Sequence, residues 1–234
     1  MVQTSKQLQE VLASASIAAA SLDIPKRMID LHREVKPSAR QQALRWGAFL
    51  LVYAPLEAFF NEVLASGGNG RVLPLNPDKL RARALALHQV HLFQSDWSLR
   101  TRVPSAGGGG RSRWALYETT ASLRHYLADM KFLRDLLSHG GNPYSATNSS
   151  SALWHVKDGW SMRLMGVEGF LQAACDLMDQ TVLAYGGRYG MIDWPQPVRS
   201  GLSAEPMPAL RKVATGQSST TAKNATPPEN CCIS

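Results

Sequence analysis

Arg134 and His139 are the two residues whose types and spacing are best suited to chemistry. They lie five positions apart at the end of a segment with helical periodicity. Two glycines follow His139, so the chain can leave the helix there and redirect the imidazole. A helix C-terminus favours the imidazolium while a nearby Arg opposes it, so His139 could exchange protons near neutral pH. The alternative is that His139 only caps the helix.

Arg134 interrupts an otherwise apolar helix face. Around Met130, a helical wheel places it in one sector with Leu123, Tyr126, Leu127, Leu133 and Leu137. Glu57 interrupts the apolar face of residues 39–65 in the same way. A guanidinium on an apolar face is costly unless an anion meets it, so we expect Glu57 and Arg134 to pair if the two helices pack together. The alternative is that both side chains extend to water from the edges of their faces.

Five segments have the pattern of helices, and they must position these residues. They are residues 5–32, 39–65, 77–90, 111–138 and 160–185. Residues 91–110, which end in four glycines, are expected to be an irregular connection. No segment has a convincing strand pattern. The sequence therefore predicts an all-α domain at residues 1–194, built as a helical bundle of four to five main helices.

Residues 39–65 have the strongest periodicity in the chain. Large apolar residues recur on one face of this segment: Trp46, Phe49, Leu50, Tyr53, Leu56, Phe60 and Leu64. Such a face predicts a helix that packs into the core of the bundle.

Composition suggests a cytoplasmic protein with a disordered C-terminal tail at residues 195–234. No window has the run of about 18 apolar residues that a membrane span needs, and the N-terminus does not resemble a signal peptide. The tail is rich in Pro, Ser and Thr. It ends in CCIS, which fits a prenylation box at Cys231, so we expect membrane association only if that cysteine is lipidated. Coincidence is the alternative for so short a motif.

The net charge of +7 is concentrated in one part of the sequence. Residues 71–113 contain eight Lys and Arg but only two Asp. A basic stretch of this kind attracts polyanions without sequence preference. The candidate RNA-binding residues are Arg81, Arg83, Arg100, Arg102, Arg111 and Arg113. The alternative is an ordinary solvated basic surface.

The string FLRDLLSHG, residues 132–140, resembles the signature of the HEPN superfamily. That signature is an Arg, a polar residue, three further residues and a His at the end of a core helix, and Asp135 fills the polar position. The string LEAFFNE, residues 56–62, resembles a front helix of HEPN proteins of the bacterial defence type, where an acidic residue approaches the motif. The resemblance covers roughly residues 5–190. Toxins paired with a nucleotidyltransferase antitoxin have a Tyr where this chain has Gly141.

The resemblance implies an endoribonuclease that needs no metal or other cofactor and acts as a homodimer. By analogy, His139 would move the proton of a ribose 2′-hydroxyl or of the leaving oxygen, and Arg134 would hold the phosphate. Asp135 or Glu57 would orient one of these two residues. RNA is then the expected partner, together with an antitoxin protein if the chain is a toxin or defence effector. Two alternatives remain: a non-catalytic HEPN module that binds RNA, nucleotide or a partner protein, and a helical scaffold in which the motif is incidental.

Overall fold

The computed structural model describes residues 2–34, 41–64, 72–94, 97–106, 110–157, 159–196 and 207–210. These residues form five helices: α1 (Val2–Glu34), α2 (Gln41–Leu64), α3 (Pro77–His88), α4 (Thr120–Ser138) and α5 (Leu164–Ala184). They also form four short strands: β1 (Leu99–Pro104), β2 (Ser112–Tyr117), β3 (Trp154–Val156) and β4 (Gly159–Ser161). The molecule is therefore mostly helical, as expected, but it is not all-α.

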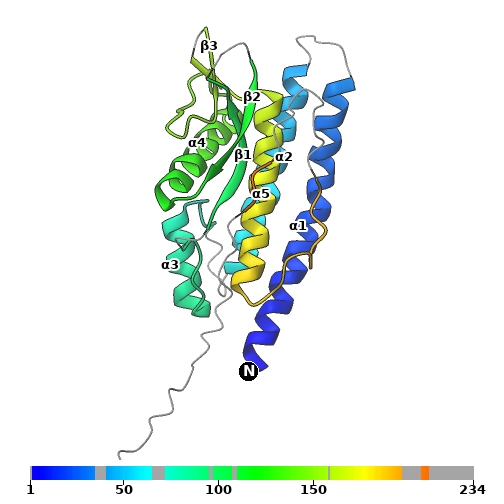
Figure 1. Ribbon diagram of the computed structural model, residues 1–234, viewed down its shortest axis with the longest axis vertical. Helices are drawn as coiled ribbons and strands as arrows, with labels where there is room; N and C mark the ends of the chain where they lie inside the picture. Colours follow the sequence, from blue (N-terminus) through cyan, green and yellow to red (C-terminus); the bar gives the residue numbers. More distant parts are fainter. Residues whose placement is uncertain are drawn as a thin grey trace, which may run out of the picture.

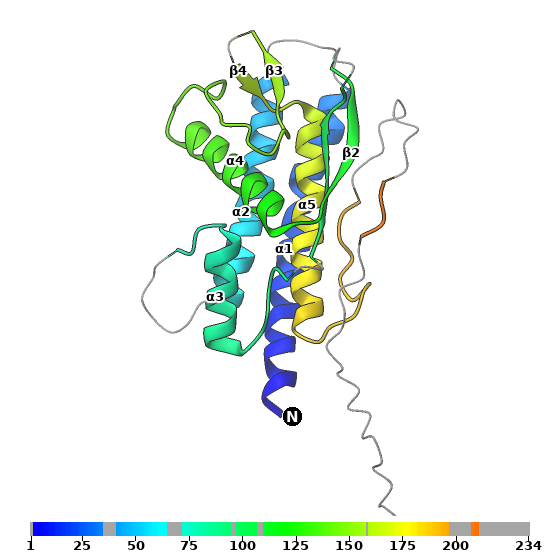
Figure 2. The same cartoon turned by 60° about the vertical axis from the view of Figure 1, so that its left-hand side comes forward.

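Three long helices form the centre of the molecule (Figure 1). α1 packs on both α2 and α5, and these two pack on each other. The hairpin of β1 and β2 lies on α5, α4 lies on the side of the molecule away from α1, and α3 lies below α4, with its last residue, His88, at the cavity between α1 and α2 (Figures 1 and 2). This arrangement leaves α1 at one edge of the bundle and places α4 across from it.

The apolar faces expected from the sequence form much of the core. On α2, Phe49, Tyr53, Leu56, Phe60 and Leu64 are all buried, and Trp46 and Leu50 pack against them from partly buried positions. On α4, the buried side chains include Leu123, Tyr126, Leu127, Met130 and Leu133, with Leu137 partly buried. α5 is buried along nearly its whole length. The predicted core faces of α2 and α4 are therefore confirmed.

The prediction of an irregular connection followed by one long helix at residues 111–138 was wrong. β1 and β2 pair antiparallel, with Leu99 opposite Tyr117 and Pro104 opposite Ser112, and the four glycines lie in the connection between them. α4 begins only at Thr120, where Thr119 and Ser122 form a capping box. The strand LRTRVP could not be recognised from its sequence because its two arginines pair with carboxylates of α5. Its polar residues are therefore not its exposed ones, and the alternation of apolar and exposed residues that marks a surface strand is missing.

The second hairpin, β3 with β4, was also absent from the prediction. It pairs Trp154 with Ser161 in antiparallel register, and Tyr144 lies beside it because the Tyr144 carbonyl accepts a hydrogen bond from the Trp160 amide at 3.0 Å. These strands are only three residues long, too short to give a periodic signal. They hold the segment that follows α4 against the start of α5.

One stretch of α2, Gln42–Leu64, is long and apolar enough to cross a membrane by length and composition alone, contrary to the expectation from the sequence. Its mean hydropathy is 1.3, and half of it is buried inside the protein, as in the core helix of a bundle. A cytoplasmic location remains a prediction. Most of the predicted tail, including Cys231, lies outside the described residues, which resume only at 207–210.

Candidate functional site

Arg134 is held between two carboxylates at the interface of α4 and α2. Its Nη2 lies 2.8 Å from Oε1 of Glu57, and its Nη1 lies 3.0 Å from Oδ1 of Asp135. The guanidinium carbon lies 4.8 Å from the centroid of the Tyr53 ring. The predicted pair between Glu57 and Arg134 is therefore confirmed, and it explains how a cation is tolerated on this face. The Arg134 side chain remains 24% exposed, so a ligand can reach it.

The surroundings of Arg134 keep it cationic. Burial acts against its charge, but Glu57, Tyr53 and Asp135 outweigh that effect, and the pKa of Arg134 is raised. Burial, with a further contribution from Glu57, also raises the pKa of the Tyr53 hydroxyl to about 12. Neither group is placed to exchange protons near neutral pH. The role that the geometry allows Arg134 is electrostatic, namely to hold an anion.

Asp135 faces Arg134 and Lys131. Its Oδ2 forms an ion pair with Nζ of Lys131 one turn earlier on α4, while its Oδ1 pairs with Arg134. Glu57 likewise faces Arg134. Two roles were expected for these carboxylates, orienting Arg134 or orienting His139. Their contacts match the first.

His139 is the residue at which the chain leaves α4. Its amide donates to the Asp135 carbonyl at 3.0 Å, and the Gly141 amide returns to the Leu136 carbonyl at 2.8 Å. Gly140 has φ of 69°, a conformation that favours glycine, so the helix ends as the sequence predicted. The His139 side chain is exposed. Among the described residues, no side-chain hydrogen bond or ion pair joins its ring to Arg134.

The path of the chain carries His139 along α2 toward its N-terminal end. Arg134 lies level with Tyr53 and Glu57 of α2. The Tyr144 hydroxyl accepts a hydrogen bond from Nε2 of Gln42, in the first turn of the same helix, at 3.2 Å. His139 lies midway between Arg134 and Tyr144 in the sequence, in the segment that connects these two contacts with α2.

A basic cavity of about 570 Å³ opens beside Tyr144. Its described lining residues are Gln42, Arg45, Tyr144, Val156, Lys157, Ser161, Arg163, Leu164 and Met165. Three of these side chains are cationic, and none of the described lining residues is acidic. Such a cavity is suited to an anion.

Arg45 is the most informative residue of this cavity. Its Nε is buried and has no hydrogen-bond partner among the described residues, and its guanidinium carbon lies 4.6 Å from the centroid of the Trp46 ring. Burial lowers the pKa of Arg45; Tyr144 opposes this effect and Arg163 adds to it. A bound anion would supply the missing acceptor and offset the repulsion between the two arginines.

This cavity was not predicted from the sequence. Its cations come from α2, from the β3–β4 connection and from the residue before α5, and Arg45 is more than one hundred positions from the other two. The signal that could have drawn attention was a lack of acids, since residues 35–47 contain Lys36, Arg40 and Arg45 with no Asp or Glu.

Arg102 is buried and Arg100 is only 17% exposed, and both are paired with carboxylates of α5, which argues against their assignment to RNA binding. Arg100 binds Asp176 through two nitrogens, with Nη2 2.6 Å from Oδ1 and Nε 3.0 Å from Oδ2. Arg102 is 3% exposed, and its Nη1 lies 3.3 Å from Oε2 of Glu168. Burial raises the pKa of both carboxyls, with the arginines acting in the opposite direction. These two arginines fasten β1 to α5, which leaves them unable to face a nucleic acid.

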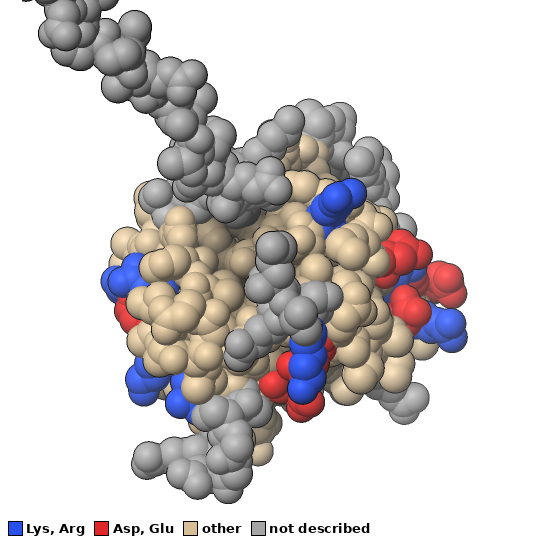
Figure 3. All heavy atoms as spheres, turned by 90° about the horizontal axis from the view of Figure 1, so that it is seen from below, with Lys and Arg blue, Asp and Glu red and all other residues tan. Residues whose placement is uncertain are grey.

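The other four candidate RNA-binding arginines fall into two groups. Arg81 and Arg83 lie on α3, where Nε of Arg83 donates to the Leu64 carbonyl at 3.3 Å. The end of the molecule seen in Figure 3 has scattered Lys and Arg side chains, several of them next to Asp or Glu. Arg111 and Arg113 are exposed on the β1–β2 hairpin. The stretch that looks continuous in the sequence is therefore not one surface.

The hairpin group lies at the same end as the basic cavity. A Cβ atom added to Gly110 would overlap the Arg163 guanidinium, so the backbone next to Arg111 lies directly against a cavity residue. Indole Nε1 of Trp154, in β3, also donates to the Arg111 carbonyl at 3.3 Å. Of the predicted RNA-binding residues, Arg111 is thus the one that the structure places nearest this cavity.

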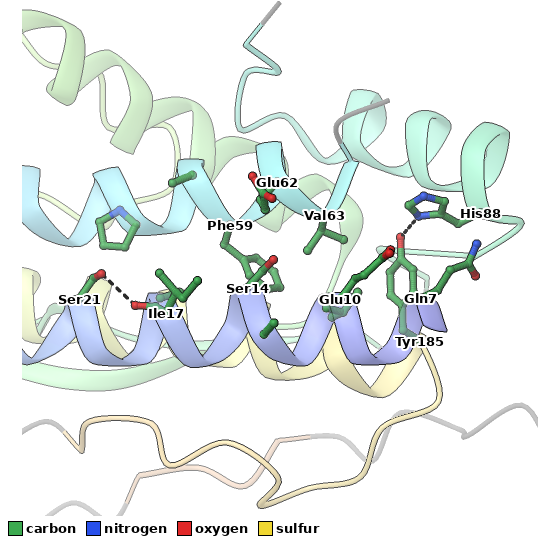
Figure 4. Close-up of a pocket in the computed structure, with 15 residues that line it drawn as sticks. Gln7, Glu10, Ser14, Ile17, Ser21, Phe59, Glu62, Val63, His88 and Tyr185 are labelled. Carbon is green, nitrogen blue, oxygen red and sulfur yellow. Dashed lines mark hydrogen bonds between the residues drawn. The ribbon is translucent and has the colours of Figure 1, made fainter. Parts of the chain in front are cut away.

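A second cavity, of about 530 Å³, lies between α1 and α2 (Figure 4). It is closed at one end by His88 and Tyr185, whose Nδ1 and hydroxyl oxygen are 2.6 Å apart. Burial raises the pKa of Tyr185 and lowers that of His88, so both groups are neutral near pH 7. Within the described part of the chain, no three His, Cys, Asp or Glu side chains are grouped to hold a metal ion.

Comparisons with known proteins do not identify this chain. No family model, no curated protein and no solved structure matches it. Function is therefore argued from the side chains themselves and from the resemblance of the motif at Arg134 and His139.

Proposed function

We propose that this protein is a metal-independent endoribonuclease whose reaction centre is formed by Arg134 and His139. The observation that carries the proposal is the placement of Arg134: it is fixed by two carboxylates, still 24% exposed, and followed on the same helix by an exposed His139 at the point where the helix ends. A positioned cation and an accessible imidazole are the two groups that hydrolysis through a 2′-hydroxyl requires.

In the proposed reaction, His139 takes the proton of a ribose 2′-hydroxyl and the 2′-oxygen attacks the adjacent phosphorus. The bond between phosphorus and the 5′-oxygen breaks, and the leaving oxygen takes up a proton from water. His139 then releases the proton of the 2′-hydroxyl to water, so the enzyme returns to its starting state. The products are a 2′,3′-cyclic phosphate and a 5′-hydroxyl. Arg134 binds the nonbridging oxygens and offsets the charge that develops on them.

Glu57 and Asp135 are positioning residues in this account. A guanidinium has five donor hydrogens, so Arg134 can keep its hydrogen bond to Glu57 while it offers others to a phosphate. The carboxylates fix the plane of the guanidinium before RNA arrives, which lowers the entropic cost of binding. They also weaken the attraction for anions, because the phosphate must compete with two negative charges.

The basic cavity would hold a neighbouring phosphate of the same strand. It lies beside Tyr144, ten positions after Arg134, and it is lined by Arg45, whose Nε has no hydrogen-bond partner among the described residues. Contacts of this kind position a strand without reading its sequence. Arg111, which lies next to the cavity, replaces Arg100 and Arg102 as a candidate contact to the backbone.

A second function is favoured by one observation. The Arg134 guanidinium is engaged by Glu57 and Asp135, and no side-chain hydrogen bond joins the His139 ring to it. This arrangement is also that of a structural ion pair in a module that binds RNA or a nucleotide in its basic cavity without cleaving it. Cleavage distinguishes the two functions, because both predict binding.

The test is cleavage of a labelled RNA in EDTA by the wild type and by His139→Ala and Arg134→Ala. We expect each variant to cut at least about 100-fold more slowly, the usual effect of removing a general acid–base or an anion-binding group. The matched controls are Arg124→Ala and His125→Ala, whose side chains are exposed on the same helix, and these should cut at the wild-type rate.

Arg134→Ala leaves Glu57 without its partner, so Arg134→Lys and thermal unfolding of every variant accompany it. A folded Arg134→Lys that cuts far more slowly supports a role for the planar guanidinium. Wild-type cleavage by either folded variant would remove that residue from the reaction. Binding of RNA without cleavage by the wild type would favour the second function.

A further inference from the structure

α1 has two apolar faces, of which the bundle uses only one. The inner face is buried, with Val11, Leu22 and Ile29 at most 3% exposed. On the opposite face Ile17 is 70% exposed and Ile24 is 57% exposed. Large aliphatic side chains aligned on the solvent face of a long helix indicate a surface that contacts a partner.

The outer face has the spacing of a coiled coil. Its residues are Glu10, Ala13, Ile17, Ala20, Ile24, Arg27 and Leu31, separated alternately by three and four positions. This is the heptad spacing by which two helices pack side by side. We name these seven residues the outer stripe.

The surroundings of the outer stripe leave room for another helix. α1 lies at one edge of the bundle (Figure 1). Residues 191–196 lie along one flank, where they share a cavity with Ser16, Asp23 and the stripe residue Ala20. The α1–α2 cavity lies along the other flank, and the stripe residues Glu10, Ala13 and Ile17 form its outer edge. Met191, on the first flank, is 47% exposed and extends the apolar surface.

We propose that the outer stripe binds the outer stripe of a second copy of this chain, with the two α1 helices antiparallel about a two-fold axis between residues 18 and 19. In this register Ile17 lies opposite Ala20 of the second copy, and Ile24 lies opposite its Ala13. Each of the two isoleucines thus meets an alanine, which favours close packing of the two helices at the centre of the interface.

Charge selects the same arrangement. In the antiparallel register, Glu10 lies opposite Arg27 of the second copy, and the two-fold axis repeats this pair at the other end. A parallel pairing in register would place Glu10 against Glu10 and Arg27 against Arg27. Like charges at facing positions are destabilising, so the antiparallel pairing is preferred.

This interface is separate from the proposed ribonuclease centre. α4, which carries Arg134 and His139, lies across the bundle from α1 in both views (Figures 1 and 2). A dimer formed through α1 leaves both centres accessible and apart. It therefore does not build the composite site that the HEPN resemblance implies, and the failure of one proposal would leave the other standing.

The first test is sedimentation of the full chain from about 1 μM to about 200 μM, where a small interface is expected to associate. We expect the mass to rise from 25.6 kDa toward twice that value. Ile24→Arg should weaken association at least about 10-fold, because it places two arginines in an apolar seam. Val72→Arg, at a side chain that is 66% exposed outside the stripe, is the control and should associate like the wild type.

The second test determines which residues of the two α1 helices face each other. Glu10→Arg and Arg27→Glu should each associate less than the wild type, since each creates two facing like-charge pairs. An equimolar mixture should regain wild-type association as a heterodimer, because every facing pair is then opposite in charge. A wild type that stays monomeric throughout would overturn the proposal. So would association that is unaffected by Ile24→Arg, or two variants whose mixture associates no better than either alone.

Discussion

Two arginines of this chain show how burial decides what a guanidinium does. Arg102 is 3% exposed and faces Glu168, which is 1% exposed, so its charge serves the fold. Arg134 is 24% exposed and faces Glu57, which is 22% exposed, so its charge is available to a ligand. Removing one partner of a buried pair costs about 3–5 kcal/mol of stability, much more than the same change near the surface.

Sequence reasoning succeeded for one of these arginines and failed for the other. The pair of Arg134 and Glu57 could be predicted because each residue interrupts the apolar face of a clear helix. When these two faces pack together, the two opposite charges can form an ion pair. Arg102 lies in a strand and alternates with polar and apolar neighbours, so nothing local distinguishes an arginine that faces Glu168 from one that faces solvent.

The basic cavity leads to a prediction about individual cations. Arg45→Gln and Arg163→Gln should each weaken binding of a 2′-O-methyl oligonucleotide and lower the slope of log K against log salt by about one, because each loses one phosphate contact. The measurement is fluorescence anisotropy at several salt concentrations. Arg81→Gln, exposed on α3, is the control and should leave both the affinity and the slope nearly unchanged.

The opposite pattern would remove the cavity from the binding surface. If Arg81→Gln weakened binding while Arg45→Gln and Arg163→Gln did not, the strand would run over α3, as the basic stretch of the sequence first suggested.

At the level of elements, the β1–β2 hairpin depends on a close approach to α5. A Cβ atom added to Gly169 would lie 2.2 Å from the amide nitrogen of Arg102. The helix must therefore carry a glycine where the strand crosses it, although glycine costs a helix interior about 1 kcal/mol relative to alanine. The sequence showed a helix with an unexplained glycine, and only the position of the strand supplies the reason.

Gly169→Ala should accordingly destabilise the protein by about 1–3 kcal/mol, since backbone atoms of β1 would have to move. Gly47→Ala in α2 is the matched control: its new Cβ would meet the terminal methyl of Met28 at 3.0 Å, and a flexible methionine can give way. That variant should be neutral or more stable, by up to about 1 kcal/mol. Urea unfolding of both variants measures the difference, and equal effects would mean that the hairpin does not press on α5 at Gly169.

Which elements could be predicted from the sequence depended on how far apart along the chain their stabilising contacts lie. The helices and their buried faces could be predicted because periodicity is local. The strands could not, because β1 is stabilised by side chains more than sixty positions away, Glu168 and Asp176, and β2 by its pairing with β1. The cavity beside Tyr144 has the same cause, since it exists only where α2, the β3–β4 hairpin and the start of α5 converge.

For the whole molecule, net charge was a poor guide to its surface. Six of the seven net positive charges come from residues 71–113, yet two arginines of that stretch neutralise buried carboxylates of α5. A cavity assembled from other segments instead groups Arg45, Lys157 and Arg163, and it is the surface that we propose for RNA. The reaction centre lies on one side of the bundle and the proposed self-association surface on the other, so catalysis and assembly can be tested separately.

The most direct test of the central claim is a single-stranded DNA with randomised sequence that contains one ribonucleotide, incubated with the protein in EDTA. Attack by a 2′-hydroxyl predicts one cut, on the 3′ side of the ribose, with a 2′,3′-cyclic phosphate on one product, a 5′-hydroxyl on the other, and no cut with His139→Ala. Cleavage at deoxyribose positions, or no cleavage at the ribose, would contradict the account.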